Sequence, residues 1–154
     1  MTDNATIRDA VPGDGEALLS LVRDHARYEK SEASISQAQL LQVLDDSTGG
    51  MRIVVAALPD KLAGYAALTF DYALWRGTRW AHLDCLFVTS SLRGQGVGRR
   101  LLRHVRQMAL RQGADRLEWQ TPLWNDKAIG FYQHEGAICI PKMRFTMQLD
   151  AGVP

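Results

Sequence analysis

A glycine-rich stretch, Arg93-Gly94-Gln95-Gly96-Val97-Gly98, constrains the fold of this 154-residue chain more than any other feature. It follows an apolar run ending in Leu86-Phe87-Val88, which predicts a strand, and it precedes an amphipathic helix. The apolar stripe of that helix consists of Val97, Leu101, Val105 and Met108. N–H groups at a helix start have no partner within the helix and bind phosphates, and Gly96 and Gly98 let a diphosphate approach the backbone. The stretch therefore predicts a diphosphate-binding loop, and the alternative is an ordinary helix start with incidental glycines.

The remaining hydrophobic pattern predicts the elements around this loop. The expected strands are residues 5–9, 53–58, 63–72, 80–88, 116–121 and 144–149, with one more short strand near 138–140. The first expected helix spans residues 14–29, and the second follows a Ser36–Gln39 capping box and ends near Gly49-Gly50. The third is the amphipathic helix after the glycine-rich stretch, which Gly113 ends, and the fourth is a short helix from Asn125 to Tyr132. Short joins predict antiparallel pairing of the middle strands, followed by a β-α-β crossover. We therefore expect an α/β (α+β) fold with a mixed sheet, in a single domain spanning residues 1–154.

Composition excludes several classes of protein. Eighteen Lys and Arg against 17 Asp and Glu give a net charge of +1, which argues against nucleic acid and against an anionic membrane. No apolar run is long enough to span a membrane, and the first residues lack a secretory pattern, so we expect a cytoplasmic location. Cys85 and Cys139 each lie in an apolar run and are predicted to be buried and reduced. No spacing of His, Cys and Asp indicates a metal site.

A second motif, Trp124-Asn125-Asp126-Lys127-Ala128-Ile129-Gly130-Phe131-Tyr132, follows further along the chain. Together with Arg-x-x-Gly-x-Gly after Leu-Phe-Val, it resembles the two acetyl-CoA-binding motifs of the GNAT superfamily of N-acetyltransferases. The segment Ala26-Arg27-Tyr28-Glu29-Lys30, and Trp75-x-Gly77 before Leu83–Val88, are similar to the spermidine/spermine and thialysine acetyltransferase branch. The resemblance runs from Thr6 to Leu149. It implies a GNAT-like fold with about four helices and a mostly antiparallel sheet of about six or seven strands, acetyl-CoA as cosubstrate, a small-molecule amine as partner and a homodimer.

The resemblance also assigns residues to the cosubstrate. They are Leu86, Phe87 and Val88 on the strand, Arg93, Gly94, Gln95, Gly96, Val97, Gly98 and Arg99 around the loop, and Asn125, Lys127 and Ala128 in the second motif. Asn125 also suits the N-cap of its own helix, and the two roles are compatible. In the family a bulge in the strand aims one N–H at the thioester carbonyl, which implies that an amide of residues 86–88 polarises it.

Two residues are candidates for proton transfer. Amine attack on a thioester expels a thiolate, whose thiol has an ordinary pKa of about 8.5, so a positioned acid helps it leave. The resemblance identifies Tyr132 as that acid, and the alternative is a tyrosine packed on the sheet. Asp84 lies among apolar neighbours, on the strand face opposite Leu83 and Cys85, and could accept the ammonium proton directly or through water. The alternative is a structural carboxylate, paired or hydrogen-bonded within the strand.

The amine itself is expected near acidic residues. Tyr28 and Glu29 match branch residues that meet a cationic substrate, and Glu118 is a weaker candidate for the same role. Solvated surface acids are the alternative. The branch usually has Glu-Asp where this chain has Asp84-Cys85, so one carboxylate is missing here.

The sequence thus predicts an acetyl-CoA-dependent N-acetyltransferase acting on a primary amine of a polyamine, a diamine or a lysine-like amino acid. One alternative is a CoA-binding regulatory or protein-interaction domain without turnover. A nucleic-acid module built on the arginine-rich helix is another, against which the near-neutral net charge argues.

Overall fold

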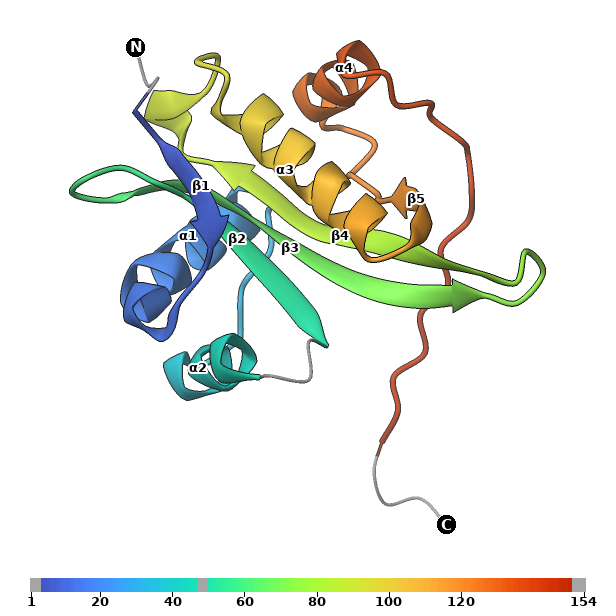
Figure 1. Ribbon diagram of the computed structural model, residues 1–154, viewed down its shortest axis with the longest axis horizontal. Coiled ribbons are helices and arrows are strands. Elements are labelled where there is room, and N and C mark those ends of the chain that lie inside the picture. Colours follow the sequence, from blue (N-terminus) through green and yellow to red (C-terminus); the bar gives the residue numbers. More distant parts are fainter. Residues whose placement is uncertain (1–3, 47–49, 151–154) are drawn as a thin grey trace. The chain divides into compact units, whose positions relative to one another are not determined.

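The computed structural model describes residues 4–46 and 50–150, which form parts of two compact units, Met1–Gln120 and Thr121–Pro154. The described part of the first unit is a five-stranded sheet with helices on it (Figure 1). Its strands are β1 (Thr6–Asp9), β2 (Met51–Ala57), β3 (Leu62–Ala73), β4 (Thr78–Val88) and β5 (Ala114–Glu118), and its α-helices are α1 (Gly15–Tyr28), α2 (Gln37–Asp45) and α3 (Val97–Arg111). The second unit contains α4 (Asp126–His134).

The sheet has the strand order β1-β2-β3-β4-β5. The first four strands pair antiparallel with their neighbours, and α3 then returns the chain so that β5 runs parallel to β4. This confirms the predicted antiparallel meander and the β-α-β unit. The β4–β5 register extends only from Arg79 to His82, whereas β4 continues to Val88. Among the described residues, the second half of β4 therefore has no strand along its β5 side.

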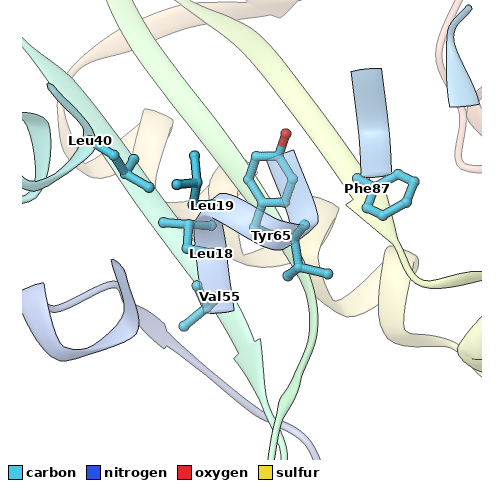
Figure 2. Close-up of a cluster of buried hydrophobic side chains, with 7 residues drawn as sticks. Leu18, Leu19, Leu40, Val55, Tyr65 and Phe87 are labelled. Atoms are coloured by element: carbon cyan, nitrogen blue, oxygen red, sulfur yellow. The ribbon is translucent and has the colours of Figure 1, made fainter. Parts of the chain in front are cut away.

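Helices cover both faces of this sheet. Helices α1 and α2 lie on one face and α3 lies on the other (Figure 1). Because neither face is open to water, residues 54–56 of β2 and residues 63–68 of β3 are buried without interruption. The predicted apolar stripe of α3 is buried, which confirms that helix. On the α1 and α2 side, a compact core gathers Leu18, Leu19, Leu40, Val55, Tyr65 and Phe87 (Figure 2).

Local signals fix the starts of the first two helices. Asp14, just before α1, accepts bonds from the Arg8 guanidinium at 2.7 and 2.9 Å and from the Val11 N–H at 2.8 Å. These donors hold the pKa of Asp14 below its usual range. Helix α2 has the predicted capping box, with Ser36 and Gln39 bonded reciprocally at 3.1 and 2.9 Å. It ends at Asp45, earlier than predicted, and Gly49 lies outside the described residues.

Two predicted strands are wrong, and the sheet has five strands where six or seven were expected. Residues 138–140 and 144–149 form no strand in the second unit. Alternating apolar residues form a strand only when a neighbouring strand pairs with their backbone groups, and these two segments have no neighbouring strand. Cys139, predicted to be buried, is exposed for the same reason. β5 also lies earlier than the predicted residues 116–121, because its register with β4 begins at Ala114.

Candidate active site

The glycine-rich stretch forms an open helix start. Gly94 and Gly96 have φ angles of 73° and 82°, in the left-handed region that favours glycine, and Gly96 is the N-cap of α3. A Cβ built at either position would meet no heavy atom within 4 Å. The backbone here is thus both uncovered and at the positive end of α3, which fits a diphosphate. Val97, Gly98 and Arg99 form the first turn of that helix.

Arg93 connects this loop to the end of α1. Its Nε donates to the Val88 carbonyl at 2.8 Å. Its guanidinium carbon lies 4.4 Å from the centroid of the Tyr28 ring and 5.2 Å from that of Phe87. The cation therefore stands over two aromatic faces, next to the expected amine site.

A β-bulge interrupts β4 at Asp84. Ala67 pairs with Cys85 and Leu68 pairs with Leu83, so Asp84 is the extra residue of the bulge. Its side chain is exposed, and Oδ2 lies 3.5 Å from the Cys85 sulfur. Beyond the bulge, Phe87 is buried, while Leu86 and Val88 are half-buried on the part of β4 that β5 does not cover.

His25, which the sequence did not single out, contacts Glu29, and the Asp84 carboxylate acts on it electrostatically. The two ring nitrogens of His25 each have a partner: Nδ1 lies 2.9 Å from the Tyr65 hydroxyl, and Nε2 lies 3.3 Å from Oε1 of Glu29. The ring also stacks on Phe87, with centroids 5.1 Å apart and planes 20° apart. The spacing of His25 and Glu29, one helical turn apart, was the sequence signal that could have revealed this contact.

The charges of this cluster are set by burial. Burial lowers the pKa of His25, against the opposing pull of the Glu29 and Asp84 carboxylates, so the ring is neutral. Burial likewise raises the pKa of Cys85 to about 12 and raises that of the Tyr65 hydroxyl. The thiol and the phenol therefore stay protonated, and negative charge is confined to the two carboxylates.

The other predicted residues lie elsewhere. Glu118 pairs with His82 in the sheet, and its carboxylate is 4.0 Å from the Arg116 guanidinium, which associates it with its own strand. The second motif belongs to the second unit. There Asn125 caps α4 as predicted, accepting from the Ala128 N–H at 3.3 Å.

Lys127 and Ala128 follow in the first turn of α4, and Tyr132 lies in its last half, with its ring 5.2 Å from that of Phe131. The residues that the structure describes contain no cluster of three or more His, Cys, Asp or Glu that could hold a metal ion. They also contain no helix long and apolar enough to cross a membrane.

Two features define the class of this protein. One is a β-α-β unit whose helix has an open start built from glycines, and the other is a bulged strand that carries a carboxylate. The chain belongs to the acetyltransferase (GNAT) family, which it matches over residues 16–137, and it is an acyltransferase enzyme. Enzymes of this family use acetyl-CoA as cosubstrate.

Particular relatives are similar over most of the chain. The thialysine N-epsilon-acetyltransferase of Bos taurus is 31% identical over 141 residues, covering 85% of this chain and 82% of the relative. The enzyme of the same name from Caenorhabditis elegans is 26% identical over 149 residues, covering 96% and 92%. Among solved structures, an aminoglycoside acetyltransferase from an uncultured soil metagenomic sample has the same fold, with a TM-score of 0.81 at 19% identity over 96% of this chain and 98% of that one.

Proposed function

We propose that this enzyme transfers the acetyl group of acetyl-CoA to a primary amine of a small cationic substrate, such as a polyamine, a diamine or a lysine-like amino acid. The observation that carries the proposal is the Glu29 carboxylate held 3.3 Å from Nε2 of His25 at the end of α1, together with the exposed Asp84 carboxylate on the bulge of β4, which acts on His25 electrostatically. Carboxylates suit an ammonium ion, which they bind through charge-assisted hydrogen bonds. Similarity to enzymes named for thialysine supports a lysine-like amine.

The chain offers suitable groups for each part of acetyl-CoA, which supplies the acetyl thioester. The N–H groups of residues 94–98 would hold the diphosphate, with Arg93 and Arg99 adding positive charge. The residues Leu86, Phe87 and Val88 lie on the part of β4 with which β5 does not pair, and their backbone would bind the pantetheine arm. Asn125, Lys127 and Ala128 of the second motif are further candidates for binding acetyl-CoA, as the family resemblance implies.

The proposed mechanism gives each residue one task. Glu29 and Tyr28 bind the positive charge of the amine, and Asp84 takes the proton from the reacting ammonium, directly or through water. The free amine then attacks the carbonyl, polarised by a strand amide of residues 86–88. The carbon–sulfur bond breaks and Tyr132 gives its proton to the departing thiolate. The new amide nitrogen loses its second proton, which restores the Tyr132 hydroxyl directly or through water. Glu118 is kept as an additional candidate for substrate binding.

Further features belong to the same proposal. The family match spans both units, which supports one functional domain over residues 1–154. Exposed apolar side chains at 138–149 support a homodimer. A cytoplasmic location remains a prediction, which the free thiols of Cys85 and Cys139 support. The absence of nucleic acid among the partners also remains a prediction, which the net charge of +1 supports.

An amine screen with detection of the released coenzyme A thiol tests the function. We expect diamines and lysine-like amines to be acetylated, and neutral monoamines to react poorly. Because Cys85 replaces a carboxylate, spermine should be no better than a short diamine. Efficient spermine turnover would refute that reading of Cys85, and absence of turnover with every amine would refute the proposed function.

A further inference from the structure

The side chain of His25 stands between the amine site and the protein core. Its Nε2 faces Glu29 on its own helix, and its Nδ1 faces Tyr65 on β3. From β4, Phe87 stacks on its ring, while the Asp84 carboxylate acts on it electrostatically, and so does the Arg93 guanidinium. With contacts on both ring nitrogens and on one face, the orientation of the imidazole is fixed.

The partners determine which nitrogen carries the proton. A carboxylate only accepts hydrogen bonds, so the neutral ring presents Nε2–H to Glu29. Nδ1 is then an acceptor, and the Tyr65 hydroxyl donates to it. Tyr65 thus fixes the tautomer of His25, and His25 donates to Glu29. Separately, the Cys85 sulfur lies 3.5 Å from Oδ2 of Asp84.

Glu29 needs such a donor because of its position. It is the C-cap of α1, where the negative end of the helix dipole disfavours a carboxylate. The imidazole N–H is the donor that holds Oε1 of Glu29 at this end of the helix. Its side chain is 36% exposed, so a carboxylate held by His25 through Oε1 still has acceptor positions for a ligand.

We propose that His25 is a positioning residue of the amine site: it holds the Glu29 carboxylate in place for a second positive charge of the substrate, and so makes the enzyme prefer diamines to monoamines. This inference deepens the proposed function and rests on it. His25 does not touch the reacting atoms. Its effect should therefore fall on binding of the distal charge and leave the chemical step unchanged.

The test compares two amines of equal chain length, 1,5-diaminopentane and pentylamine. Affinities are measured by calorimetry with coenzyme A present, and KM and kcat by thiol release. His25→Phe keeps the ring stacked on Phe87 and removes both nitrogens. We expect the affinity for diaminopentane to fall about tenfold, which equals about 1.4 kcal/mol, and its KM to rise by the same factor. Pentylamine affinity, acetyl-CoA affinity and kcat at saturation should each change less than about twofold.

Two further variants separate positioning from general damage. His25→Gln places an amide N–H near Nε2 and should restore most of the diamine affinity. Tyr65→Phe removes only the hydroxyl that donates to Nδ1 of His25. It should also lower the diamine affinity, by a smaller factor than His25→Phe. This variant keeps the inference testable even where His25→Phe does not fold. Unchanged diamine affinity in a folded His25→Phe, or equal weakening of both amines, would overturn the inference. Wild-type diamine binding without any turnover would refute the proposed function and leave the inference about binding standing.

Discussion

Tyr132 is the residue on which the proposed chemistry is most directly testable. Tyr132→Phe keeps the ring and removes only the hydroxyl. General acid catalysis contributes ~10²–10⁴-fold, so kcat should fall at least about tenfold, allowing for water as a substitute donor, with little change in acetyl-CoA affinity. A purely structural tyrosine predicts the reverse, a lower melting temperature with turnover per folded molecule intact. Measuring kcat, acetyl-CoA affinity and thermal stability on the same variant decides between these roles, provided that the chemical step is rate-limiting.

The neutral state of His25 has its own consequence for stability. Its pKa is lowered by burial in the folded protein, while the unfolded chain has the ordinary value of about 6.5. As pH falls below about 6.5, the unfolded state binds a proton that the folded state does not, so the free energy of unfolding decreases. Urea unfolding between about pH 7.5 and 5.5 should therefore show a steeper loss of stability in the wild type than in His25→Phe. Parallel curves for the two proteins would mean that folding does not lower the pKa of His25.

At the scale of elements, the junction between the glycine loop and α3 carries the cosubstrate prediction. Gly96→Val places a branched side chain where the backbone is now uncovered, in a left-handed conformation that costs about 1–3 kcal/mol. We expect acetyl-CoA affinity, measured by calorimetry, to be abolished. Gly113→Val is the matched control: Gly113 has a φ of 76° and equally open space, but it lies after the C-terminus of α3. It should lose similar stability and keep acetyl-CoA affinity. Unchanged affinity in a folded Gly96→Val would remove the loop from the cosubstrate site.

Elements with strong local signals were predictable from the sequence. The stripe of α3, the Ser36–Gln39 capping box and the Asn125 N-cap depend on residues within one or two helical turns, and all three are confirmed. The start of β5 was misplaced, because the boundary of a strand depends on its register with a neighbour that is distant in the chain. The end of α2 was also misplaced.

At the scale of the whole molecule, several apolar side chains of the second unit are exposed in a single copy of the chain. They are Ile138, Ile140, Met143, Phe145, Met147 and Leu149. Light scattering after size exclusion should show a dimer whose fraction grows with concentration, because such side chains gain by burial against a second copy. The double variant Phe145→Ser, Met147→Ser should shift it toward monomer, whereas Leu110→Ser, at an exposed apolar position on α3, should not. A wild-type protein that stays monomeric at every concentration would contradict the homodimer.

The sequence by itself determined the β-α-β unit, the glycine-built helix start and the family, because each depends on residues close together in the chain. It also indicated Tyr28, Glu29 and Asp84 as an acidic amine site. Only the tertiary structure brought the His25 ring, which contacts Glu29, against Tyr65 of β3 and Phe87 of β4. Only the structure, too, left residues 144–149 without a strand partner. Both depend on contacts between distant segments, and the pattern of a single segment does not specify which segment lies beside it.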